Sequence, residues 1–70
     1  MREYAFLFVR KESAPDSQKN CMTVNSWRDM EQAKASARMY LWMMRADYQR
    51  VSIYIKEDTL WVDSGEFVES

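Results

Sequence analysis

The sequence predicts an α+β domain of ββαββ order, in which an antiparallel sheet is covered on one face by one helix. Three observations predict this class. Segments rich in β-branched and aromatic residues flank the middle of the chain on both sides. Residues 30–46 contain no Gly or Pro and are rich in helix formers. A length of 70 residues allows a single domain, 1–70.

The N-terminal third predicts two strands joined by a loop. Residues 2–10 are β-branched and aromatic and are bounded by charge, which is typical of a strand. Residues 11–19 carry Ser, Pro and Asp and predict a loop that is long for a hairpin. Residues 20–27 alternate weakly between polar and apolar side chains, and we expect a second strand there.

The helix has a capping signal at its start. Asp29 can serve as N-cap, with Gln32 three residues later completing a capping box. The alternative N-cap is Ser26, with Asp29 three residues later at the third position of the helix. We expect the helix to run from Met30 to Ala46, with Arg45 in the last turn. At 100° per residue, one stripe faces the core, and it comprises Met30, Ala33, Ala37, Tyr40, Leu41 and Met44.

The C-terminal third predicts a hairpin and a tail. Residues 50–56 and 59–63 alternate as strands do, and Glu57-Asp58 between them predicts a tight turn. Gly65 is expected to break the last strand, which leaves residues 64–70 as an acidic C-terminal tail.

Composition excludes most chemistry. The chain has no His and one Cys, so the commonest general base, an internal disulfide and an ordinary zinc site are all missing. It also has no glycine-rich phosphate loop and no pair of carboxylates on one face of a regular element. We therefore expect no enzymatic activity, no catalytic residue, no metal and no cofactor.

The same composition points to the cytoplasm. A single Cys21 fits a reducing compartment. The N-terminus shows no signal peptide, and the apolar run of residues 4–9 is too short to span a bilayer. We expect a cytoplasmic protein that does not bind membranes.

The strands and the helix show more apolar faces than one small fold buries. In the strands, an aliphatic set suits packing under the helix and an aromatic set is left on the other face. We predict that this second face is open and forms a candidate partner surface, comprising Tyr4, Phe6, Phe8, Tyr54 and Trp61.

The side of the helix opposite the core stripe carries a second apolar group. Trp42, Met39 and Met43 lie there, rimmed by Arg38 and Arg45. Such residues suit a partner surface, because Met adapts its shape and Trp supplies anchor area. The alternative is a broad core stripe on a deeply buried helix.

Surplus apolar surface favours association over catalysis. We expect a protein-binding module that acts on a host or regulatory complex and forms a homodimer. The alternative is single-stranded nucleic-acid binding, with bases stacked on the aromatic sheet face and flanked by Arg10, Lys11, Arg50 and Lys56. The net charge of −1 gives little support to binding of a nucleic-acid duplex.

The segment Asp29-Met30-Glu31-Gln32-Ala33-Lys34-Ala35, placed between two strand pairs, resembles a small bacterial and phage layout. In that layout an acid-capped helix follows two strands and precedes a hairpin. The chain is similar in this pattern to small phage proteins that inhibit host machinery, among them anti-CRISPR proteins and phage inhibitors of host RNA polymerase. The resemblance implies a small cytoplasmic inhibitor without enzymatic activity, and it assigns no functional residue.

Overall fold

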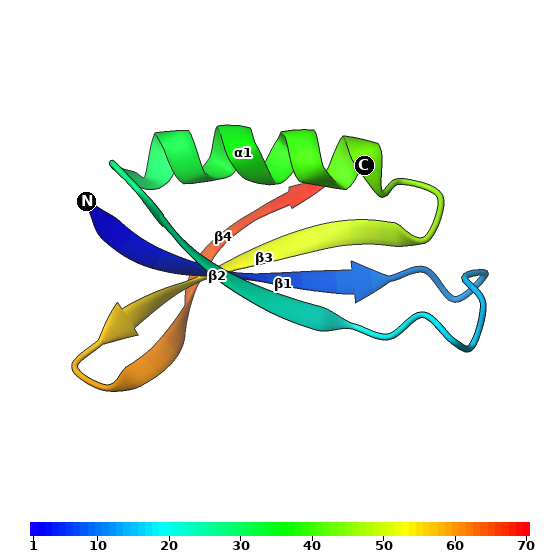
Figure 1. Cartoon of the computed structure of the whole chain (residues 1–70), viewed down its shortest axis with the longest axis horizontal. Coiled ribbons are helices and arrows are strands. Elements are labelled where there is room, and N and C mark those ends of the chain that lie inside the picture. Colours follow the sequence, from blue (N-terminus) through cyan, green and yellow to red (C-terminus); the bar gives the residue numbers. More distant parts are fainter.

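Four strands and one helix follow each other in the predicted ββαββ order in a computed structural model that describes residues 1–70 (Figure 1). They are β1 (Arg2–Arg10), β2 (Cys21–Trp27), α1 (Met30–Met43), β3 (Tyr48–Glu57) and β4 (Leu60–Glu69). The strands form one sheet in the order β2-β1-β3-β4, and all neighbours are antiparallel. Helix α1 packs along one face of the sheet (Figure 1). The predicted α+β class is confirmed.

Helix α1 begins at the predicted cap. Asp29 is extended, with φ −157°, and its carboxylate accepts a hydrogen bond from the backbone N–H of Gln32 at 3.0 Å. The Gln32 side chain reaches back and accepts the backbone N–H of Arg28 at 2.7 Å. Asp29 is therefore the helix start, and Ser26 is not, because Ser26 still belongs to β2.

The helix ends earlier than predicted. The sequence predicted a helix to Ala46, but α1 stops at Met43 and residues 44–47 form turns that lead into β3. The backbone N–H of Tyr48 donates to the Met44 carbonyl at 3.0 Å, which fixes this connection. Arg45 consequently lies beyond the last helical turn.

The core lies between α1 and the sheet. Phe6, Val51 and Ile53 are the largest fully buried side chains. From above, α1 contributes the small Ala33 and Ala37, which are both completely buried. The remaining buried members of this cluster are Tyr4, Phe8, Leu41, Tyr48 and Val68. The predicted core stripe of α1 is confirmed, because its other members, Met30, Tyr40 and Met44, pack against this cluster.

One prediction about the sheet is wrong. Tyr4, Phe6 and Phe8 are 2%, 0% and 3% exposed and face α1, so they do not lie on an open aromatic face. Antiparallel pairing places Phe6 opposite Ile53, and directly opposite residues share a face. The physical reason is volume, since the small Ala33 and Ala37 leave space above the sheet, which the rings of β1 fill together with Val51 and Ile53.

The other face of the sheet carries the aliphatic side chains of β1. Ala5 and Leu7 of β1 pair with Val24 and Met22 of β2, so these residues share this face. The one helix of the chain lies on the opposite side of the sheet, so no helix covers this face (Figure 1). Met22 and Val24 are 45% and 46% exposed.

Strand β4 continues through Gly65 to Glu69, so residues 64–70 do not form the predicted tail. Ser52 pairs with Phe67 and Tyr54 with Asp63, which leaves three residues of β4 opposite the single residue between them on β3. Gly65 adopts φ 84° within this bulge, a backbone conformation that suits Gly.

The bulge is closed by a hydroxyl group. Ser64 Oγ donates to the Ile53 carbonyl at 2.6 Å and accepts the backbone N–H of Glu66 at 3.1 Å. Beyond the bulge, Glu66 forms an ion pair with Lys34 of α1 at 2.9 Å, and Val68 is buried in the core. The end of the chain is thus an integral edge strand.

The β3–β4 turn is one residue later than predicted. Glu57 pairs with Leu60, so the two turn residues are Asp58 and Thr59. Asp58 adopts φ 54°, a left-handed conformation that Asp tolerates better than most residues. The 14-residue α1 does not meet the length and apolarity that a helix needs to cross a membrane.

Candidate functional site

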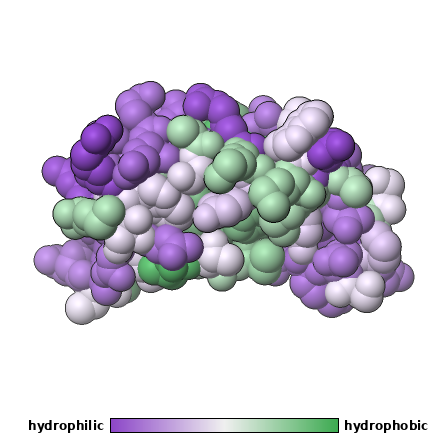
Figure 2. All heavy atoms as spheres, turned by 45° about the horizontal axis from the view of Figure 1, so that its top comes forward, coloured by the Kyte–Doolittle hydropathy of each residue, from purple (hydrophilic) through white to green (hydrophobic).

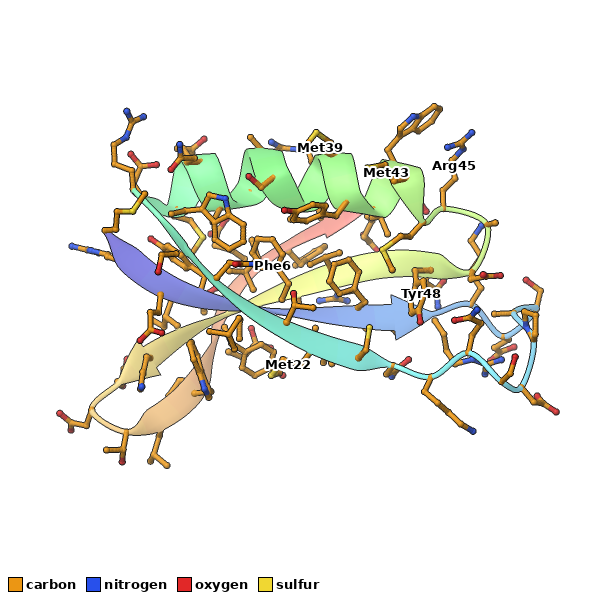
Figure 3. The ribbon with its side chains drawn as sticks, viewed as in Figure 1. Phe6, Met22, Met39, Met43, Arg45 and Tyr48 are labelled. Atoms are coloured by element: carbon orange, nitrogen blue, oxygen red, sulfur yellow. The ribbon has the colours of Figure 1, made fainter.

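Met39, Trp42 and Met43, here called the outer helix patch, lie on the side of α1 away from the sheet. Their exposed fractions are 56%, 64% and 70%. Spacings of three and four residues bring them together on one side of the helix. In Figure 3, Met39 lies on the outer side of α1, whereas Phe6 lies between the helix and the sheet. Hydrophobic atoms gather at the centre of the face seen in Figure 2, between hydrophilic ends.

Arg45 holds the indole of the outer helix patch in place. Its guanidinium carbon lies 3.8 Å from the centroid of the Trp42 ring, a cation–π contact. Its Nη1 also donates to the Trp42 carbonyl at 2.7 Å, which satisfies one of the free carbonyls at the helix end. Trp42 is therefore presented to solvent in a defined orientation.

The charges at the rim of this patch are positive and unpaired. The ion pairs of the chain are Arg28–Asp29, Lys34–Glu66 and Lys56–Glu3, and none of them involves Arg38 or Arg45. Both arginines are exposed. The outer helix patch thus combines three apolar anchors with two guanidinium groups that form no ion pair within the chain.

A second apolar surface lies on the uncovered side of the sheet. We call it the open sheet face, and it comprises Leu7, Val9, Met22, Val24, Tyr54, Trp61 and Phe67. Cations lie beside two of its rings: Arg50 is 4.0 Å from the Phe67 centroid, and Lys56 Nζ is 5.8 Å from the Trp61 centroid. Met22 marks this side of the sheet in Figure 3.

The structure divides the second predicted surface. Tyr54 and Trp61 lie on the open sheet face, while the other three predicted members face α1. The sequence interpretation missed the other five members of this face, which are Leu7, Val9, Met22, Val24 and Phe67. The alternation of Met22 and Val24 with polar neighbours was the signal that could have found those two.

No cluster of chemically reactive groups accompanies these surfaces. Cys21 is exposed, and no three His, Cys, Asp or Glu side chains come together as metal ligands would. Tyr48 donates its hydroxyl to the Lys19 carbonyl at 2.8 Å, and burial raises the pKa of this phenol. These contacts tie the loop before β2 to the start of β3, which is a structural task.

The chain matches no family model, no curated protein and no solved structure. The outer helix patch and the open sheet face are therefore the features from which a function can be inferred. Both are apolar, and both are bordered by cationic side chains. Surfaces of this kind bind other macromolecules more often than they perform reactions.

Proposed function

We propose that the protein is a non-enzymatic binding module that occupies a surface of a larger host complex and thereby inhibits or modulates it. The observation that carries this proposal is the exposure of Met39, Trp42 and Met43 on one side of α1. They belong neither to the buried core cluster, to which α1 contributes Ala33, Ala37 and Leu41, nor to the residues packed against it. Contiguous exposed apolar side chains on a small domain favour a partner surface.

The outer helix patch suits insertion into an apolar groove. Helices that bind in grooves use anchors at positions i, i+3 and i+4, which is the spacing of Met39, Trp42 and Met43. Trp42 supplies the large anchor, and the flexible Met side chains adapt to the walls of the groove. Arg38 and Arg45 would pair with acidic side chains at its rim. Occupancy of the groove then excludes the complex's own ligand, and no reaction is required.

Trp42→Glu tests the proposal, with Leu60→Glu as its matched control. Leu60 is 69% exposed at the tip of the β3–β4 hairpin, so both variants place a carboxylate on an exposed apolar position. A protein captured from host lysate is purified and titrated against each variant. Loss of a central Trp anchor costs roughly 2 kcal/mol or more, which is about 30-fold in affinity. We expect this loss for Trp42→Glu and unchanged affinity for Leu60→Glu.

Circular dichroism and urea unfolding accompany the titration. The free energy of unfolding of both variants is expected to lie within about 0.5 kcal/mol of that of the natural chain, because neither position is buried. Equal affinity of Trp42→Glu and the natural chain contradicts the proposal. Unfolding of Trp42→Glu contradicts it too, since it would make Trp42 a core residue.

The structure removes most of the aromatic sheet face from which single-stranded nucleic-acid binding was inferred. The stacking platform predicted from the sequence contained five rings, and Tyr4, Phe6 and Phe8 are buried under α1. Of these five rings, Tyr54 and Trp61 remain on the open sheet face, where Phe67 also lies. We expect that oligonucleotides at low salt leave the tryptophan fluorescence unchanged, whereas base stacking would quench it.

A further inference from the structure

The two edges of the sheet differ in their protection against further strands. Strand β2 is hydrogen-bonded to β1 on one side and has no neighbour on the other. Its seven residues, Cys21–Trp27, include no charge, no Gly and no Pro, and every residue before Trp27 is exposed. A neutral, regular edge with free N–H and C=O groups is a template for another strand.

The opposite edge carries the features that block such pairing. Strand β4 contains three acidic residues, Asp63, Glu66 and Glu69, and the bulge around Gly65 interrupts its regular backbone. Like charges and a bulge both discourage the addition of a strand. Protection on β4 and its absence on β2 indicate that pairing is confined to one edge, which gives a closed assembly and not a fibre.

We propose that two copies of the chain pair through their β2 strands, antiparallel about a two-fold axis, into one continuous sheet. The strand is self-complementary in this arrangement. With Val24 on the axis, Met22 lies opposite Ser26 of the second copy, and Thr23 lies opposite its Asn25. No charged residues meet, and alternate outward-facing backbone groups of β2 gain hydrogen-bond partners.

The pairing also extends both faces of the sheet. On the open sheet face, the half-exposed Val24 would lie directly opposite Val24 of the second copy, and Met22 would lie diagonal to the same side chain. On the helix side, a hollow of about 210 Å³ lies between α1 and β2 and would be bordered by the second β2 strand. Its lining is mostly apolar and comprises Phe8, Cys21, Thr23, Asn25, Tyr40 and Met44.

The symmetry has a consequence for the outer helix patch. A two-fold axis perpendicular to a continuous sheet keeps both helices on the same side of that sheet. The dimer would therefore present two copies of Met39, Trp42 and Met43 in one direction. The pairing itself uses none of these residues, so it can fail while the proposed function holds, and the reverse is also true.

Sedimentation equilibrium tests the pairing with Val24→Lys and, as matched control, Val62→Lys. Val24 and Val62 are 46% and 37% exposed, and each lies on an edge strand. At high micromolar concentration, the natural chain and Val62→Lys should sediment at twice 8.4 kDa. Val24→Lys should sediment as a monomer, because it places like charges across the axis. An equimolar mixture of Val24→Lys and Val24→Glu should restore the dimer mass.

Amide hydrogen exchange of the natural chain separates edge pairing from other dimers and needs no variant. We expect alternate amides of Cys21–Trp27 to become protected as the concentration rises into the dimer range. Three results would overturn the proposal. The natural chain could be a monomer, its dimer could leave the β2 amides in free exchange, or Val24→Lys could form a dimer without Val24→Glu. Protection of β2 that arises only with a foreign strand-forming partner overturns it as well.

Discussion

Phe6→Ala distinguishes a core ring from a surface ring. Phe6 is fully buried, stacks on Trp27 with centroids 4.6 Å apart and planes at 13°, and meets Phe8 and Tyr40 edge to face. Truncation of a buried Phe to Ala costs about 3–5 kcal/mol. A 70-residue domain has a total stability of about 4–10 kcal/mol, so the variant loses a large share of it.

Urea unfolding followed by circular dichroism measures this loss. With a slope near 1 kcal/mol per molar urea for so small a chain, the midpoint should fall by about 3 M or more. Leu7→Ala is the control, because Leu7 is the next residue on the strand and lies on the open sheet face, only partly buried. Both variants are compared at one low protein concentration, so that self-association affects them equally.

The comparison has a clear refuting result. If Phe6→Ala lowers the midpoint by less than Leu7→Ala, then the ring is not the centre of the core, and the sheet faces are assigned the wrong way round. A smaller change at Leu7 is expected because part of its surface already contacts water in the folded chain. The sign of the difference between neighbouring residues therefore decides which face α1 covers.

Two further predictions concern backbone control. Hydrogen bonding from the Gln32 N–H lowers the pKa of Asp29, so its stabilising contribution is present above about pH 4 and is lost as the pH falls through the lowered value. Asp29→Asn retains a cap without this titration, and thermal melts should show a smaller acid-induced loss. Gly65→Ala meets no atom within 4 Å, yet φ 84° should cost about 1–2 kcal/mol in urea unfolding; an unchanged midpoint would contradict this reasoning.

Element order could be predicted from the sequence because it depends on local patterns. The cap at Asp29 and the helix formers after it define α1 without reference to the rest of the chain. The helix end was missed by three residues, since no Gly or Pro marks it. A glycine was also given too much weight, because Gly65 bends β4 without ending it.

The sheet faces could not be predicted in the same way because they depend on register. Alternation divides each strand into two sets, but a shift of one residue exchanges them. Grouping aliphatic with aliphatic side chains joined Leu7 to Ile53, whereas the fold places Phe6 opposite Ile53. The useful clue was the small size of Ala33 and Ala37, which requires large rings from the sheet beneath them.

The central position of β1 shapes how the chain folds. Its two partner strands differ in their distance along the sequence, because β2 follows shortly after β1, whereas β3 comes only after the helix. During synthesis the β1–β2 hairpin emerges first, with the ring of Phe6 still uncovered. Pairing of β1 with β3 closes a loop that contains β2 and α1, a non-local step that slows folding. The rate-limiting step of folding is therefore expected to be the docking of the β3–β4 hairpin against β1, the first strand to be synthesised.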